Sequence, residues 1–229
     1  GSKFFTTLNV TLGRNVGAGN LIIEEGGWLE TTDTDRAIEI SQTGTVTVLV
    51  TGDGSKLTSI NGTIVVGMYN SHPGTLTVED SGLVQTKSIT MGFDGAGEGY
   101  IHMGVGGVLA VSGEHTTNPF VSGGLFTTNG SSTGEIQYNP SGDGTTWVNM
   151  TGAILDTDYT LTYDATGGPT VNGQDLSGYT VLTMLDTTTP AADPEITSIT
   201  SLGGGNFELT LKGEPSTSYE FYSSATLDF

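Results

Sequence analysis

A short phrase, Gly-x-apolar-x-apolar, returns along this chain at a nearly constant spacing. It is present as Gly19-Asn-Leu-Ile-Ile, Gly44-Thr-Val-Thr-Val, Gly74-Thr-Leu-Thr-Val, Gly99-Tyr-Ile-His-Met and, more weakly, Gly124-Leu-Phe-Thr-Thr. The steps between the leading glycines are 25, 30, 25 and 25 residues, so the unit is a repeat. A period of this size predicts a solenoid, in which each repeat buries its apolar side only by stacking on its neighbours.

The alternation within the phrase predicts which side chains face the core. Residues two apart lie on the same face of a strand, so both apolar columns of the phrase should point inward. We therefore expect a structural core that contains Leu21, Ile23, Val46, Val48, Leu76, Val78, Ile101, Met103 and Phe126.

Two further β-rich runs complete each repeat. One follows a turn at Gly27, Gly82 or Gly107, and the other ends at Leu12-Gly13, Val66-Gly67 or Met91-Gly92. Three short strands joined by glycine-rich corners match one turn of a parallel β-helix, because glycine reaches backbone angles that other residues reach only at a cost. The longer second step contains Thr51-Gly-Asp-Gly-Ser-Lys56, which we interpret as a corner insertion.

Several segments of the repeat region resemble a known family. They are Val48-Leu-Val-Thr-Gly-Asp-Gly-Ser-Lys-Leu57, Gly62-Thr-Ile-Val-Val-Gly67, Gly74-Thr-Leu-Thr-Val-Glu-Asp-Ser-Gly82, and Met91-Gly92 leading to Gly99-Tyr-Ile. Over roughly residues 8 to 125, the chain resembles the autotransporter-associated β-helix repeats of large exported bacterial surface proteins. The resemblance implies a right-handed parallel β-helix on the cell surface or outside the cell, with a structural or adhesive role. It indicates fold and location better than it indicates a partner.

The sequence predicts an all-β chain with four parts. We expect a regular right-handed parallel β-helix, with turns of about 25 residues, over 1–125, and irregular terminal turns or a cap that close it over 126–186, including a tight turn at Asn172-Gly173. Two prolines and small residues indicate a linker over 187–195. Residues 196–229 resemble the opening strands of an immunoglobulin-like or fibronectin-like β-sandwich, which needs ~100 residues when complete.

Charge and cysteine content exclude several classes of protein. Six Lys+Arg against 25 Asp+Glu give a formal net charge of -19, whereas nucleic-acid binding demands clustered basic residues. No cysteine is present, which excludes disulfides, zinc–thiolate sites and cysteine nucleophiles. The apolar runs are far shorter than the ~18 residues of a membrane span. No signal peptide is visible, so a secreted protein would be present here in a mature or recombinant form from which the targeting segment has been removed.

A polysaccharide-degrading enzyme is the main alternative, because parallel β-helices include lyases and hydrolases that act on pectin. A lyase needs Arg or Lys beside a metal or base, and a hydrolase needs converging carboxylates. The candidate residues are Arg14 with Arg36, Asp33 with Asp35, and Asp156 with Asp158. We interpret the arginines as surface charge and the aspartates as solvated corners.

No Ser or Cys phrase typical of a nucleophile accompanies the three histidines, His72, His102 and His115. His102 occupies the outward position between Ile101 and Met103, so we expect a solvated side chain. The histidines therefore predict no catalytic arrangement, and we expect neither a catalytic residue nor a cofactor.

Calcium is the one ion that the sequence suggests, through Asp94 and Glu98 in the stretch Gly92-Phe-Asp-Gly-Ala-Gly-Glu-Gly99. This stretch occurs once and lacks the nine-residue period of calcium-binding β-helices. Four acceptor phrases for N-glycosylation also occur, at Asn9, Asn61, Asn129 and Asn149. In a chain so rich in Thr and Ser, this number is near chance.

Together these observations predict a non-enzymatic extracellular structural protein, a β-helical fibre subunit or surface stalk. Strand-like sequence begins at once, with Phe4, Phe5, Leu8 and Val10, and no polar cap precedes it. A solenoid end without a cap favours stacking on another copy, so we expect a homo-oligomer or filament formed end to end. A carbohydrate-binding adhesin with a polysaccharide or cell-surface matrix as partner is the alternative to this structural role, alongside the enzyme.

Overall fold

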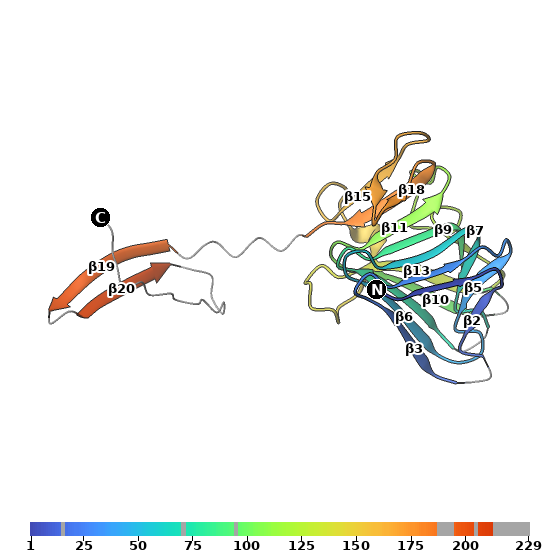
Figure 1. Cartoon of the computed structure of the whole chain (residues 1–229), viewed down its shortest axis with the longest axis horizontal. Coiled ribbons are helices and arrows are strands. Elements are labelled where there is room, and N and C mark those ends of the chain that lie inside the picture. Colours follow the sequence, from blue (N-terminus) through green and yellow to red (C-terminus); the bar gives the residue numbers. More distant parts are fainter. Residues whose placement is uncertain (15–16, 70–71, 94–95, 187–194, 204–205, 213–229) are drawn as a thin grey trace. The chain divides into compact units, whose positions relative to one another are not determined.

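The computed structural model describes residues 1–14, 17–69, 72–93, 96–186, 195–203 and 206–212. The chain divides into two compact units, Gly1–Thr187 and Thr188–Phe229. The first unit is a β-solenoid, as the repeat predicts, and the described residues are all-β apart from one short 3-10 turn (Figure 1).

Each turn of the solenoid contributes strands to three faces. One face is a six-stranded sheet in the order β14-β13-β10-β8-β6-β3. The other two faces belong to one larger sheet, because β7 and β9 are long enough to pair first with the strand of one face and then with that of the next. The strands of the turns are β1 (Lys3–Thr6), β2 (Val10–Leu12), β3 (Gly19–Ile23), β4 (Trp28–Thr31), β5 (Arg36–Ile40), β6 (Val46–Thr51), β7 (Lys56–Val66), β8 (Gly74–Glu79), β9 (Leu83–Met91), β10 (Glu98–Met103), β11 (Val108–Ser112), β12 (Thr127–Thr128) and β13 (Thr133–Tyr138).

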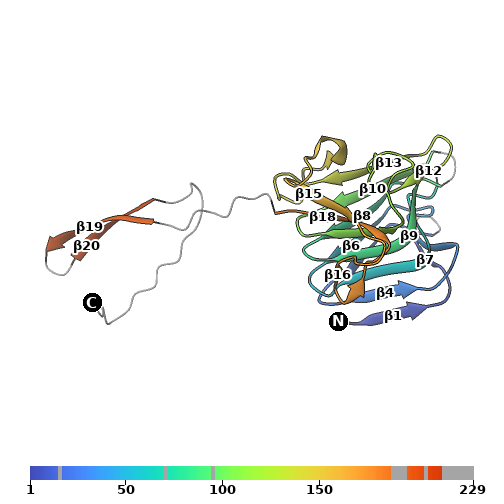
Figure 2. The ribbon, with the colours of Figure 1, turned by 90° about the horizontal axis from the view of Figure 1, so that it is seen from above.

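Neighbouring turns are joined by parallel pairing of equivalent strands. Figure 2 shows β1, β4, β7 and β9 as successive levels of the coil. Parallel strands need a long crossover, which the remainder of each turn supplies here. Equivalent side chains therefore stack directly above one another, and each turn is stabilised by the turns on either side.

The pairing register corrects two details of the predicted columns. Val46, not Gly44, lies opposite Gly19 and Gly74, so the second phrase is shifted by two residues. A shift of two keeps every side chain on its face, and the inward residues are unchanged. The fifth phrase, at Gly124, is wrong, because the strand that continues this sheet starts at Thr133 and places Gly134 opposite Gly99.

The predicted core residues pack into one continuous apolar cluster. Of the nine, Leu21 is partly buried in the first turn and the others are buried, including Phe126 at 3% exposure. The columns read across the sheet are Leu21, Val48, Leu76, Ile101 and Ile136, and Ile23, Val50, Val78, Met103 and Tyr138. Burying an aliphatic side chain contributes about 1.5–3 kcal/mol, so stacking of these columns is the main source of stability.

Glycine is required at the corners for two physical reasons. Gly67 has a φ of +70°, and a Cβ there would overlap the carbonyl oxygen of Glu98 in the next turn. Ser41 occupies the equivalent corner with a φ of +66°, and its buried hydroxyl donates to the carbonyl oxygens of Gly44 and His72. Gly82 has no positive φ, but a Cβ there would overlap the carbonyl oxygen of Val50. The prediction that glycine supplies a backbone angle unfavourable for other residues is confirmed at Gly67. At Gly82, the close approach of the Val50 backbone explains why a side chain cannot be present.

The regular coil is longer than predicted, and a cap of antiparallel strands follows it. Parallel pairing continues to Tyr138 rather than ending at 125. Strand β18 then pairs antiparallel with both β11 and β15, and β14 pairs antiparallel with β13. The elements of the cap are β14 (Val148–Asn149), the 3-10 turn η1 (Met150–Gly152), β15 (Tyr159–Tyr163), β16 (Thr170–Val171), β17 (Gln174–Asp175) and β18 (Tyr179–Met184). Within 126–186, one further parallel strand, β13, is thus followed by reversed strands that cap the coil, because antiparallel strands cannot form another parallel turn.

The hairpin β16–β17 lies along the outside of the coil. Its tight turn at Asn172-Gly173 is the one that the sequence predicts, with φ angles of +48° and +72°. The Asn172 amide donates to the carbonyl oxygens of Ser55 and Ser81, in two successive turns, and its own carbonyl accepts from Lys56. The hairpin thus ties the cap to the body of the solenoid.

The second unit contains an antiparallel pair of strands, β19 (Glu195–Gly203) and β20 (Asn206–Lys212). A hairpin here agrees with the strand pattern expected from residue 196 onward. The predicted linker at 187–194 and the remainder of the predicted sandwich at 213–229 lie outside the described residues.

Candidate functional site

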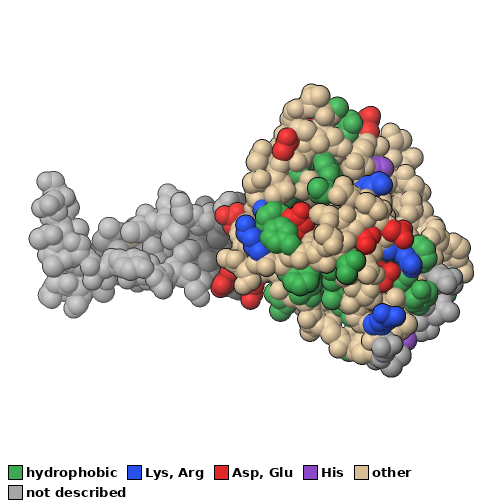
Figure 3. Space-filling model, turned by 45° about the vertical axis from the view of Figure 1, so that its right-hand side comes forward, with side chains coloured by type: hydrophobic (Ala, Val, Ile, Leu, Met, Phe, Trp, Pro, Cys, Tyr) green, Lys and Arg blue, Asp and Glu red, His purple; other side chains and the backbone are tan. Residues whose placement is uncertain are grey.

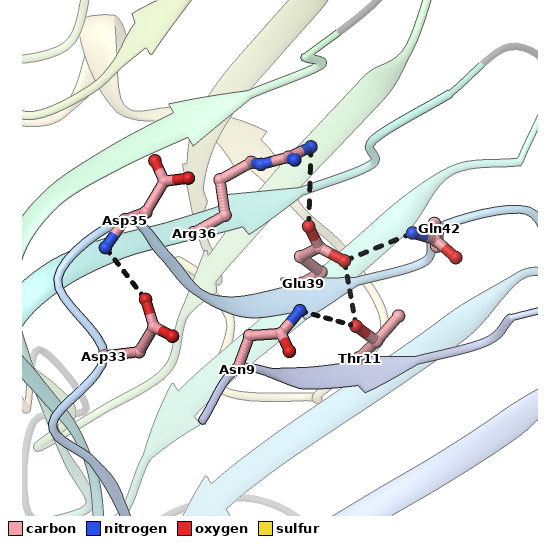
Figure 4. A network of polar contacts seen from close by, with 7 residues as sticks. All are labelled: Asn9, Thr11, Asp33, Asp35, Arg36, Glu39 and Gln42. Atoms are coloured by element: carbon pink, nitrogen blue, oxygen red, sulfur yellow. Dashed lines mark hydrogen bonds and ion pairs between the residues drawn. The ribbon is translucent and has the colours of Figure 1, made fainter. Parts of the chain in front are cut away.

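Among the side chains that the structure describes, Glu39 is the most buried charged one, and it lies at the centre of a polar network on β5 (Figure 4). Its Oε2 accepts from Thr11 Oγ1 at 2.9 Å and from Gln42 Nε2 at 3.2 Å, and its Oε1 lies 3.6 Å from Arg36 Nη1. Arg36 also lies 5.0 Å from the centre of the Phe93 ring. The network fastens β2 of the first turn to β5 of the second, which is a structural task.

The residue pairs that could serve an enzyme form turns instead. Asp33 Oδ1 accepts from the backbone N–H of Asp35, and Asp158 Oδ2 accepts from that of Ile154. Arg36 is engaged by Glu39, and the described residues give Arg14 neither an ion pair nor a hydrogen bond. The structure does not join the two arginines into a site.

The histidines occupy three different environments. His115 Nε2 lies 3.0 Å from the carbonyl oxygen of Ser112, and the backbone oxygen of His72 accepts from Ser41. His102 faces outward, as predicted, but the expectation that it is solvated is wrong. The Trp147 ring stacks on it at 4.2 Å between centroids, so burial lowers the pKa of His102, partly opposed by a hydrogen bond with Gln137. The loop that carries Trp147 covers the His102 ring. The alternation of residues along β10 does not reveal such a loop.

The calcium and glycosylation candidates are only partly described. Asp94 lies outside the described residues, and Glu98 is exposed at the start of β10. No group of three His, Asp or Glu side chains that could hold a metal ion occurs within the described ranges. Asn9, Asn61 and Asn129 are exposed, whereas Asn149 accepts from the backbone N–H of Thr151 as the N-cap of η1.

The first turn of the solenoid is open at its outer side. Phe4 points toward the core, opposite buried Leu29, yet it is 57% exposed because β1 is the last strand of its sheet among those described. Leu8 is 69% exposed, and Phe5 and Ile22 are also exposed. Of the predicted self-association residues, Phe4, Phe5 and Leu8 are thus exposed, and Val10 is partly buried. Between β1, β3 and β4 lies an open cavity of ≈ 490 Å³.

Exposed apolar side chains also gather at the opposite end. Among the described residues, the other exposed large hydrophobic residues are Ile60 on the side of the coil, and Val121, Val148, Ile154 and Leu155 in or next to the cap. Among the described strands, the cap ends in β15, which pairs with β18 along one edge and is bridged on the other only at Tyr159, by Leu155. Figure 3 shows one face of the molecule, on which hydrophobic side chains lie beside both basic and acidic ones. Both ends therefore present apolar side chains beside a free strand edge.

A third feature is a groove of ≈ 270 Å³ outside the six-stranded sheet. Its walls come from the end of β8, the corner after β10 and the loop 139–147, and include Glu79, Asp80, Gly104, Asn139 and Trp147. Sequence reasoning missed this groove, because its two sides are separated by about sixty residues of chain. The signal that could have found it is Trp147, a large aromatic residue in a Gly- and Thr-rich loop.

No family model, curated protein or solved structure matches this chain. Across the described residues, no helix has both the length and the apolar content needed to cross a membrane.

Proposed function

We propose that this chain is a non-enzymatic structural protein, a β-solenoid subunit that associates end to end outside the cell. The observation that carries this proposal is the placement of exposed apolar side chains at the two ends of the coil. Phe4, Phe5 and Leu8 at one end, and Ile154 and Leu155 at the other, lie beside the free edges of β1 and β15. Such edges pair readily with another strand.

The two ends differ in charge in a way that favours head-to-tail contact. Residues 1–25, which include the corner that lines the open end, contain two basic residues, Lys3 and Arg14, and two acidic ones, Glu24 and Glu25. Residues 121–186 contain seven acidic residues and no basic ones. Two caps therefore repel each other, whereas the open end carries no net side-chain charge, so charge favours contact of a cap with the open turn of the next copy over contact of two caps. A heterologous contact of this kind builds a filament if it does not close into a ring.

The roles of the ionisable residues support a structural function. Arg36 and Glu39 join two turns, and Asp33 and Asp158 hold backbone turns. These are contacts that stabilise a coil. The extracellular location rests on the resemblance of residues 8 to 125 to repeats of exported surface proteins.

Sedimentation velocity over a range of protein concentrations tests this proposal. We expect the sedimentation coefficient to rise with concentration, because association buries the apolar side chains that the two ends expose. Leu8→Ser should abolish the rise, because it removes an exposed apolar side chain from the open end.

Ile60→Ser is the matched control, because it removes an exposed apolar side chain from the side of the coil. It should associate like the parent protein. A concentration-independent monomer, or an equal loss of association in both variants, would contradict the proposal.

A further inference from the structure

The groove beside Trp147 is held open by a loop with a defined internal structure. Asp143 accepts hydrogen bonds from the backbone N–H groups of Thr145 and Thr146, from the Thr146 hydroxyl and from the Asn139 amide, at 2.7–3.1 Å. These bonds, led by the one from Thr145, hold the pKa of Asp143 well below its usual range. The loop therefore places Trp147 in one position, stacked on His102.

The floor of the groove is arranged around Glu79. The next residue along this outward column is Gly104, where a Cβ would lie 2.6 Å from the Cβ of Glu79. The missing side chain leaves room for the Glu79 carboxylate over the sheet. Within the described part of the chain, this carboxylate has no hydrogen-bond partner, although the residue is half-buried. It is an acceptor in a sheltered place, with an indole on the other side of the groove.

The chemistry of these walls identifies the ligand class. Two carboxylates, of Glu79 and Asp80, are available as hydrogen-bond acceptors, and the Trp147 ring offers an apolar surface. A ligand that fits both has hydroxyl donors around its rim and an apolar C–H face. The volume of ≈ 270 Å³ is below the range of about 300–1,000 Å³ typical of pockets for drug-sized ligands, which favours a single ring.

We propose that this groove binds a neutral pyranose ring of a glycan, with Trp147 against the ring and Glu79 accepting from its hydroxyls. Acidic sugars are excluded, because Glu79 and Asp80 line the site and the chain carries a net charge of -19. The groove lies on the side of the solenoid, so this activity is independent of association through the ends.

Isothermal titration with a panel of soluble oligosaccharides tests the proposal. The neutral probes are oligomers of glucose, galactose, mannose and N-acetylglucosamine, and the acidic probe is an oligomer of galacturonic acid. We expect the protein to bind at least one neutral probe and not the acidic one.

Three variants locate the site. Trp147→Ala should weaken binding at least tenfold, as loss of a central aromatic contact typically does. Glu79→Gln, which keeps the shape but removes the charge, should weaken it less. Phe5→Ala removes an aromatic side chain from the open end and should bind like the parent protein.

The urea midpoint of each variant shows whether it is folded, so a folding defect is not read as lost binding. If no neutral probe binds, if the acidic probe binds equally well, or if folded Trp147→Ala retains full affinity, the proposal is wrong. Trp147→Ala should also leave the concentration dependence of sedimentation unchanged, so the two proposals can fail separately.

Discussion

At the scale of single residues, this chain places few charges where burial makes them matter. Glu39 is 2% exposed and serves three partners from two turns. Glu79 is half-buried beside Asp80 and has no such partners among the described residues. The first carboxylate stabilises the coil, and the second costs stability. This contrast leads to two opposite predictions.

We predict that Glu39→Ala lowers the free energy of unfolding by about 1–3 kcal/mol, because Thr11, Gln42 and Arg36 lose their shared acceptor. Urea denaturation followed by circular dichroism measures this change. Asp35→Ala removes an exposed carboxylate from the same segment and should change it by less than about 0.5 kcal/mol. Equal effects of the two substitutions would show that the network adds nothing to stability.

We predict the opposite sign for Glu79→Gln at neutral pH. Burial, and then the charge of Asp80, raise the pKa of Glu79, so the folded state binds its proton more tightly than the unfolded state does. The ionised group therefore costs stability above its folded pKa and does not below its unfolded pKa. The urea midpoint of Glu79→Gln should exceed that of the parent at pH 7, and the difference should vanish at about pH 3, which is below the ordinary pKa of a glutamate. A difference that is the same at both pH values would rule out this cause.

At the scale of elements, the corners decide how closely the turns stack. Gly67 and Gly144 have nearly the same φ, +70° and +68°, but only Gly67 approaches the backbone of another turn. We predict that Gly67→Ala lowers the free energy of unfolding well beyond Gly144→Ala, which bears only the strain of the φ angle, about 1–3 kcal/mol. Thermal or urea unfolding of both variants measures the difference. Similar losses would mean that backbone angle, rather than close approach, sets the need for glycine at the corner.

The elements also show what the sequence could and could not predict. Alternation of apolar and polar residues along a strand predicts the inward face without knowledge of the strand register. Val46 and Val48 are therefore core residues even though the second phrase is shifted by two residues in the register. The corner at Ser41 was missed, because a serine with left-handed backbone angles is held by two hydrogen bonds that the sequence does not display. The antiparallel pairing of β18 with β11 and the cover over His102 were missed, since both depend on contacts between segments distant in the chain.

At the scale of the whole molecule, the two ends of the coil differ in charge and both expose apolar side chains. The first turn and the corner after it carry two basic and two acidic side chains, the cap carries only acidic ones, and both ends expose apolar side chains next to a strand edge. In the proposed filament, β1 of one copy contacts β15 of the next. The chain contains no cysteine, so engineered cysteines can report on this contact without background.

The most direct measurement mixes two single-cysteine proteins, Phe5→Cys in β1 and Thr162→Cys in β15, under oxidising conditions. Both positions are exposed in the folded chain. Head-to-tail contact predicts that the mixture forms disulfide-linked heterodimers much faster than either protein alone forms homodimers. If Phe5→Cys alone links as fast as the mixture, or the mixture links no faster than either protein by itself, the claim is contradicted.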